Sequence, residues 1–177
     1  MAFDQQKFKT MIHYIIASVE NPSDLGAVKL NKIAWFIDGM SFKNFGRTMT
    51  GATYMKQPQG PVPRAMVPVM RELASEGKIT VEDVRYFGRT KKQYISQLAV
   101  DKDQFTVEEM SLIDEITKLI SQNFTGAEVS EITHSTAWKV AKTGENIPFN
   151  AYLVDDFSEI TEKDIEWAKA KVLESAA

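Results

Sequence analysis

The segment from Lys29 to Arg64 constrains the fold more than any other part of this sequence. Residues 27–45 predict a helix with large apolar side chains on two separate sides, and such a helix normally lies at the centre of its domain. Its first apolar stripe consists of Leu30, Ile33, Ala34, Ile37 and Met40, and its second of Val28, Trp35 and Phe42. Other elements must therefore pack around this helix.

The third side of the same helix is basic, and it carries Lys29, Lys32, Phe36 and Lys43. We interpret this side as exposed, with the lysine stems reaching water and Phe36 either docking a partner or packing under a loop. Gly46 ends the helix, and residues 52–56 predict a short strand. The run Gly60-Pro61-Val62-Pro63 predicts a rigid turn, because proline fixes φ and glycine permits a close approach.

Periodicity and capping signals elsewhere predict a mainly helical α+β protein with a small antiparallel sheet or hairpin. A helix is expected over residues 3–19, and a hairpin over 79–99 with its turn at 88–91. Apolar spacing from Val62 to Leu73 predicts a further helix that Pro68 kinks or delays. Capping boxes begin helices at Thr106 and Thr125. We expect one compact domain over residues 1–177, in which 146–156 are irregular and a final helix, 161–175, packs on the rest.

Charge is unevenly distributed along the chain, although the net charge is only −3. Residues 29–100 contain twelve Lys or Arg and five Asp or Glu, which gives +7, whereas 101–177 contain seven and sixteen, which gives −9. Such a division indicates either a polyanion or an acidic protein as partner of the basic half, or two halves that neutralise each other.

Catalytic and metal-binding patterns are missing from the sequence. There is no cysteine, and the two histidines, His13 and His134, have no zinc-type spacing. His13 lies off the apolar stripe of its helix and is expected at the surface. His134 and Ser135 are neighbours, but no G-x-S-x-G elbow exposes a serine nucleophile. We expect neither an enzyme nor a bound metal or cofactor.

The sequence also favours a cytoplasmic protein with no membrane partner. No apolar run approaches the roughly eighteen residues that a membrane helix needs, and the first residues show no signal-peptide pattern. A winged-helix-like nucleic-acid binder remains an alternative, because a helix is followed by a hairpin that bears Arg85, Arg89, Lys91 and Lys92. Against it, the helix before this hairpin offers only Arg64 and Arg71, with two prolines.

Three ordered motifs resemble those of the Panacea domain, the SocA-like antitoxin family. The first is K-L-x-K-I-x-W-F at Lys29–Phe36, and it includes Leu30, Ile33 and Trp35; the second is G-P-V at Gly60, Pro61 and Val62. The third is Glu131-Ile132-Thr133-His134 followed by Trp138. The resemblance spans about residues 5–142. Gln59 and Pro68 depart from the family pattern.

The resemblance implies an antitoxin that binds and neutralises a toxin protein, with no catalytic role of its own. It also allows a proteolytic adaptor that delivers a bound partner to a cytosolic protease, and some family members occur in prophages. Trp35, His134 and Trp138 would then be core or buried-network residues. Partner contacts are expected at exposed positions, namely Lys29, Lys32, Phe36, Lys43, Arg85, Arg89, Lys91 and Lys92, and in the irregular stretch 146–156.

Overall fold

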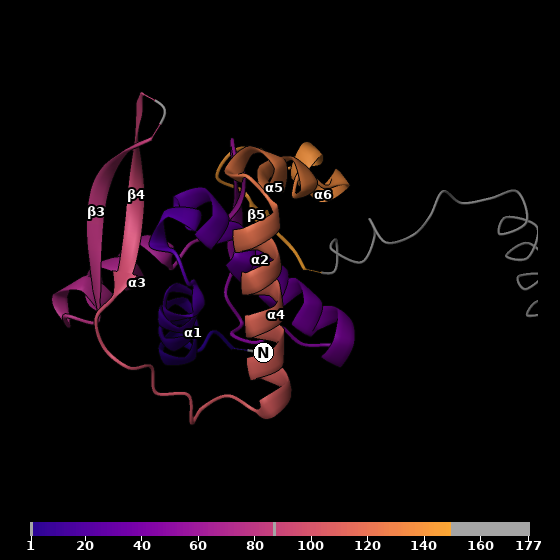
Figure 1. Cartoon of the computed structure of the whole chain (residues 1–177). Coiled ribbons are helices and arrows are strands. Elements are labelled where there is room, and N and C mark those ends of the chain that lie inside the picture. The colour runs from indigo at the N-terminus through magenta and orange to yellow at the C-terminus, as the bar shows by residue number, and fades with distance from the viewer. Residues whose placement is uncertain (1, 87, 150–177) are drawn as a thin grey trace, which may run out of the picture.

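A computed structural model describes residues 2–86 and 88–149 of the chain. It confirms the mainly helical α+β class with antiparallel strands (Figure 1). The predicted helix 161–175 and most of the stretch 146–156 lie outside the described residues. In chain order the elements are α1 (Gln5–Ser18), the 3-10 turn η1 (Pro22–Asp24), α2 (Ala27–Phe45), β1 (Tyr54–Gln57), β2 (Gly60–Pro63), α3 (Met66–Ser75), β3 (Ile79–Tyr86), β4 (Arg89–Ser96), α4 (Val107–Asn123), α5 (Gly126–Ile132), α6 (Thr136–Val140) and β5 (Asn146–Ile147).

Helix α2 occupies the centre, as its two apolar stripes predict. It packs against α1, α4, α5 and the strand β2. Leu30, Ile33 and Ile37 are fully buried, and Trp35 from the second stripe is 2 % exposed. Gly46 ends the helix with φ +67° and donates its N–H to the Phe42 carbonyl, which is the left-handed cap that glycine adopts without strain.

Helix α1 is covered by α2, α3, β4 and α4, and residues 10–16 are buried without a break. The prediction that His13 is exposed is therefore wrong. His13 lies under β4, where its Nε2 is 3.0 Å from the Ser96 Oγ. Burial lowers the pKa of the His13 ring, and the nearby Lys78 charge lowers it further. The apolar stripe of this helix predicts one buried face, whereas neighbouring elements also cover the side that carries His13.

The predicted rigid turn at residues 60–63 is instead an edge strand. β2 pairs with β1, which also pairs with β5, and the turn lies one step earlier at Pro58 and Gln59. Arg64 donates its backbone N–H to the Thr53 carbonyl. Backbone groups alternate in direction along a strand, so the nitrogens of Pro61 and Pro63 point away from β1. Prolines are tolerated there because an outward position on an edge strand needs no N–H donor.

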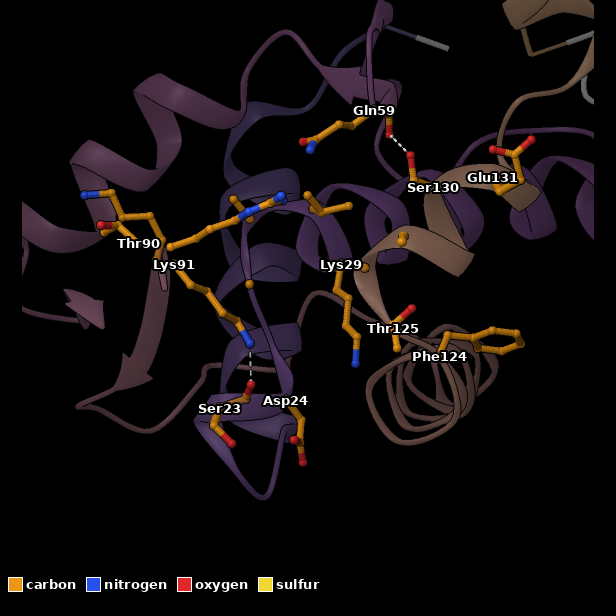
Figure 2. Close-up of a pocket in the computed structure, with 17 residues that line it drawn as sticks. Ser23, Asp24, Lys29, Gln59, Thr90, Lys91, Phe124, Thr125, Ser130 and Glu131 are labelled. Atoms are coloured by element: carbon orange, nitrogen blue, oxygen red, sulfur yellow. Dashed lines mark hydrogen bonds between the residues drawn. The ribbon is translucent and has the colours of Figure 1, made fainter. Parts of the chain in front are cut away.

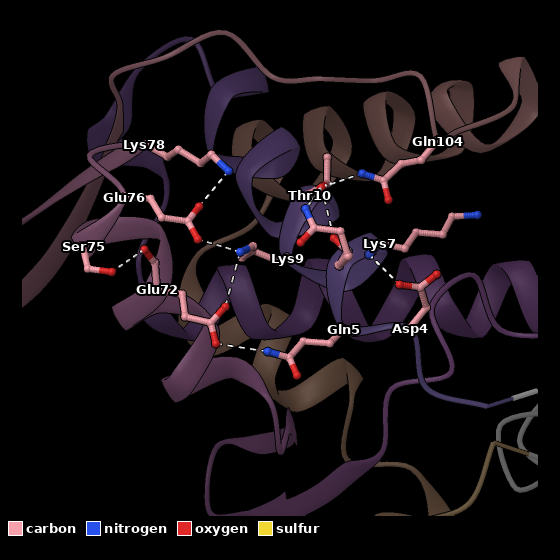
Figure 3. A network of polar contacts seen from close by, with 11 residues as sticks. Asp4, Gln5, Lys7, Lys9, Thr10, Glu72, Ser75, Glu76, Lys78 and Gln104 are labelled. Atoms are coloured by element: carbon pink, nitrogen blue, oxygen red, sulfur yellow. Dashed lines mark hydrogen bonds and ion pairs between the residues drawn. The ribbon is translucent and has the colours of Figure 1, made fainter.

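Helix α3 begins at Met66 and not near Val62, which belongs to β2. Pro68 falls in the first turn, where a helix has no partner for the backbone N–H, so it causes no break. Polar side chains join α3 to α1 (Figure 3). Lys9 forms ion pairs with Glu72 and Glu76, at 3.4 and 2.7 Å, and Lys78 also pairs with Glu76 at 2.7 Å.

The two-stranded hairpin β3–β4 projects from the helical body (Figure 1). Its strands pair from Ile79 with Ser96 to Tyr86 with Arg89. The predicted four-residue turn is thus too long, because the strands continue to positions 86 and 89 and Gly88 turns with φ +76°. Arg89 and Lys91 consequently lie on β4 itself.

The two capping boxes are confirmed. Thr106 and Glu109 exchange side chain to backbone hydrogen bonds at the start of α4, and Thr125 and Glu128 do the same for α5. The two helices follow each other with only residues 124 and 125 between them, and this junction faces the hairpin across the first turn of α2.

Candidate functional site

A cleft of about 930 Å³ lies between the hairpin and the α4–α5 junction. β4 forms one side, the first turn of α2 forms the floor, and residues 124–127 of the junction form the other side (Figure 2). The charged side chains on its lining are Asp24, Lys29, Arg89, Lys91, Lys92 and Glu131. We call this feature the hairpin cleft. It brings together four of the eight predicted partner contacts.

Lys29 and Lys91 reach the same end of the hairpin cleft from opposite elements (Figure 2). The Lys29 Nζ donates to the Ser121 carbonyl in the last turn of α4 at 2.8 Å, and the Lys91 Nζ donates to the Ser23 carbonyl at 2.5 Å. Both ammonium groups are thereby held in place by backbone oxygens, which carry only partial charge.

Burial lowers the pKa of both ammonium groups. For Lys29 the charge of Asp24 opposes this shift, while the charge of Lys91 adds to it. For Lys91 the charge of Asp24 again acts in opposition. The two lysines therefore repel each other in a partly desolvated place, and a further negative charge there would stabilise both protonated forms.

The rest of β4 adds exposed positive charge at the mouth of the hairpin cleft. Arg89 is exposed, and Lys92 is exposed and forms an ion pair with Asp83 at 2.8 Å. The lysine stem of residue 91 covers Gly26, where an added Cβ would lie 2.8 Å from the Lys91 Cε. The N-cap glycine of α2 thus lets β4 approach the helix closely.

The remaining predicted contacts lie outside the hairpin cleft. Phe36 is half-buried and packs against the core. Lys43 is exposed in the last turn of α2, at the end of the helix remote from the cleft floor. Arg85 is exposed on β3 opposite Thr90. The structure therefore divides the predicted contact residues between different surfaces.

Lys32 corrects the sequence interpretation most clearly, because it is not exposed at all. Its side chain is 1 % exposed, and its Nζ donates to the Pro61 carbonyl at 2.8 Å. Burial lowers the pKa of this ammonium group from 10.5 to about 7. Among the described residues no carboxylate pairs with it. The strand β2 covers the side of α2 that carries Lys32.

The three sequence motifs meet at this buried lysine. Gly60 adopts φ +97°, and a Cβ there would lie 2.4 Å from the Thr133 Oγ1 and 2.8 Å from both the Cε and Nζ of Lys32. Only a residue without a side chain fits between Lys32 and Thr133. The first motif on α2, the second on β2 and the third after α5 are therefore parts of one packed junction.

Hydrogen bonds from α5 and α6 to the β1–β2 turn hold this junction closed. The Ser130 Oγ donates to the Gln59 carbonyl at 2.9 Å, and the Trp138 Nε1 donates to the Gln57 carbonyl at 3.0 Å. The His134 ring stacks on Trp138 with centroids 3.7 Å apart, and the Lys56 Nζ lies 4.2 Å from the Trp138 ring centroid. His134 and Trp138 are half-buried.

A second buried polar group, Asp38, was not among the predicted site residues. The Thr50 N–H and hydroxyl donate to Asp38 at 3.0 and 2.8 Å. The Tyr54 hydroxyl lies 2.9 Å from Asp38 and 2.8 Å from the Ala34 carbonyl. Burial raises the pKa of the Asp38 carboxyl to about 6, although these hydrogen bonds oppose the shift. Its only sequence signal is a lone acid within an apolar helix.

A smaller hollow of about 330 Å³ adjoins the hairpin cleft, since both are lined by Ala27, Val28 and Gln59. Asn31, Lys32 and Gln57 are among its other lining residues. The Asn31 side-chain oxygen is buried and has no hydrogen-bond partner among residues 2–86 and 88–149. Cleft and hollow thus adjoin each other over the first two turns of α2, and we call the two together the groove.

None of the helices within the described residues is both long and apolar enough to cross a membrane. The same residues also contain no group of three His, Cys, Asp or Glu side chains that could hold a metal ion.

The family model described as "Antitoxin SocA-like, Panacea domain" matches residues 30–139. Neither the curated proteins nor the solved structures yield a match to this chain. The matched range begins at Leu30 and ends at Lys139, so it includes all three motifs apart from Lys29.

Proposed function

This chain belongs to the SocA-like antitoxins that carry a Panacea domain, and from that premise we propose that it neutralises a toxin protein by binding it directly in the cytoplasm. Family membership over residues 30–139 is the observation that carries the proposal. In this role the chain performs no chemistry, and its surface excludes the toxin from its target.

The contrast between buried motif residues and the exposed charges on β4 supports a binding role. Internal packing involves Lys32, Gly60 and Thr133, and it keeps α2, β2 and α5 in a fixed arrangement. The exposed charges on β4 project from this fixed body. We place the toxin contact at the hairpin cleft, because rigid elements that present a few charged side chains lose little entropy on binding.

The exposed face of α3 does not favour the nucleic-acid alternative. Helix α3 precedes the hairpin, as a recognition helix would in a winged-helix protein. Its exposed side chains are Val67, Pro68, Arg71, Ala74 and Ser75. Readout of base edges normally needs several long polar side chains on one helix face, and Arg71 is the only one in this set.

Co-expression with the product of the neighbouring gene tests the proposal. We expect the two proteins to co-purify and the chain to restore growth that the neighbour inhibits. Absence of both a complex and a growth effect would refute direct neutralisation. The half-life of the neighbour after translation is stopped separates the remaining roles, because a proteolytic adaptor shortens it and a simple inhibitor does not.

A further inference from the structure

We propose that the groove formed by the hairpin cleft and the adjoining hollow binds an extended acidic segment of the partner protein. This inference rests on the proposed function and assigns a chemistry to the segment that the toxin inserts. The occupant carries carboxylate side chains toward β4 and runs along the first two turns of α2.

Charge complementarity supports an acidic occupant. Four cationic side chains and two acidic ones line the hairpin cleft, and one of the cations, Lys92, is paired with Asp83 on β3, which leaves a net charge of +1. Lys29 and Lys91 approach each other there while their Nζ atoms donate to carbonyl oxygens. A carboxylate placed between them would relieve their repulsion and accept charge-assisted hydrogen bonds.

The floor of the groove offers a further site for a peptide. In the hollow, the buried Asn31 oxygen lacks a donor within the described part of the chain. An extended chain supplies such donors, because every residue other than proline carries a backbone N–H.

An acidic protein segment fits this groove better than a nucleic acid does. Duplex DNA carries one negative charge per about 1.7 Å of its axis, and a continuous phosphate backbone would also meet Asp24 and Glu131 on the lining. A peptide can place single carboxylates beside Lys29, Lys91 and Arg89 and uncharged residues beside the two acids.

A fluorescein-labelled oligoglutamate peptide and a labelled duplex DNA serve as probes for the full-length chain in fluorescence anisotropy. We expect the peptide to bind with an affinity that falls as salt rises. The double variant Arg89→Glu with Lys92→Glu should weaken binding by about tenfold or more, because it turns two cleft cations into anions. The neutral pair Arg89→Gln with Lys92→Gln should give an intermediate loss.

The matched control reverses the charge of one arginine and one lysine outside the groove. Arg47 and Lys118 are exposed and lie outside the groove, so Arg47→Glu with Lys118→Glu should leave peptide affinity within about twofold, since both variants have the same net charge. Equal losses in groove and control variants would overturn the inference. Binding of DNA without binding of the peptide would also overturn it, in favour of nucleic acid.

The toxin itself separates this inference from the proposed function. If wild-type chain binds and neutralises the neighbouring gene product, and the double-glutamate variant does so equally well, neutralisation stands and the groove assignment falls. If sedimentation shows that the chain alone forms a dimer and that the groove variant is a monomer, a second copy occupies the groove and the inference is overturned. Loss of toxin binding in the groove variant alone supports it.

Discussion

The Lys32 ammonium nitrogen lies 2.8 Å from the Pro61 carbonyl oxygen, and this contact joins two motifs that are separated along the chain. It places a titratable group in the protein interior beside a glycine that tolerates no side chain. Keeping a buried lysine protonated costs free energy when its hydrogen-bond acceptor is a neutral carbonyl. Because of this cost, the stability of the packing around Lys32, Gly60 and Thr133 should depend on pH.

Protein stability should rise with pH in the range where Lys32 titrates. The folded-state pKa of about 7 lies below the unfolded value of 10.5, so the unfolded state binds more protons between these values and the free energy of unfolding increases with pH. Between the two pKa values the free energy of unfolding should rise by an amount on the order of several kcal/mol. Lys32→Met should remove most of this slope between pH 7 and 9, as measured by urea denaturation. Lys118→Met, at an exposed position, should retain it.

Asp38 should act in the opposite direction at lower pH. Its folded-state pKa of about 6 lies above the unfolded value of 3.8, so the stabilising effect of its proton is complete below about pH 4 and is lost as pH rises through 6. Asp38→Asn should flatten this dependence in thermal unfolding scans between pH 4 and 7. An unchanged slope in the variant would show that Asp38 is ionised throughout.

The Tyr54 hydroxyl lies between the Asp38 carboxyl and the Ala34 carbonyl, and it favours the ionised carboxylate when it donates to Asp38. The single Tyr54 hydroxyl proton cannot serve both the Ala34 carbonyl and Asp38. If Asp38 is protonated, it donates to Tyr54, which then donates to Ala34. Tyr54→Phe leaves the Ala34 carbonyl without this donor, and we expect it to destabilise the fold by about 1–3 kcal/mol in urea denaturation.

A methyl group at residue 60 should be poorly tolerated. Gly60→Ala introduces a Cβ that overlaps Thr133 and Lys32 at a positive φ, and we expect a loss of about 3 kcal/mol or more in chemical denaturation. Gly46→Ala is the matched control, because Gly46 also has a positive φ but an added Cβ meets nothing within 4 Å. It should cost only about 1–2 kcal/mol. Adding Thr133→Ala to Gly60→Ala should recover part of the loss, and no recovery would place the strain in the backbone.

Trp138 should hold α6 to the β1–β2 turn through its indole N–H. Trp138→Phe keeps an aromatic ring next to His134 and Lys56 but loses the hydrogen bond to Gln57, and we expect a loss of about 1–2 kcal/mol. Hydrogen exchange at residues 54–63 should increase. Gln57→Ala keeps the carbonyl acceptor and should leave exchange nearly unchanged. A similar increase in both variants would show that exchange here responds to any nearby substitution and not to the indole hydrogen bond.

Local chemistry made part of this fold predictable. The capping boxes at Thr106 and Thr125 and the end of α2 at Gly46 depend on residues within one turn of the feature they create. The family resemblance likewise follows from short ordered motifs. These parts of the sequence analysis are confirmed because no distant element alters them.

Burial by distant elements explains the predictions that failed. The helical spacing around Lys32 and His13 indicated exposure, but β2 covers the first and β4 covers the second. The hairpin cleft could not be predicted either, since Lys29 and Lys91 meet only through the packing of α2 against β4. Within the described residues, sequence spacing identified the chemistry of these side chains but not their neighbours.

The β3–β4 hairpin described above has a consequence for folding kinetics. Each residue of β3 pairs with a residue of β4 that is close in the sequence, and such a hairpin can form within about 1–10 μs, before distant helices have assembled. Because β3 and β4 pair only with each other among the described residues, the hairpin needs no other strand to complete its ladder. It can therefore be in place before the slower packing of β4 against α1 and α2.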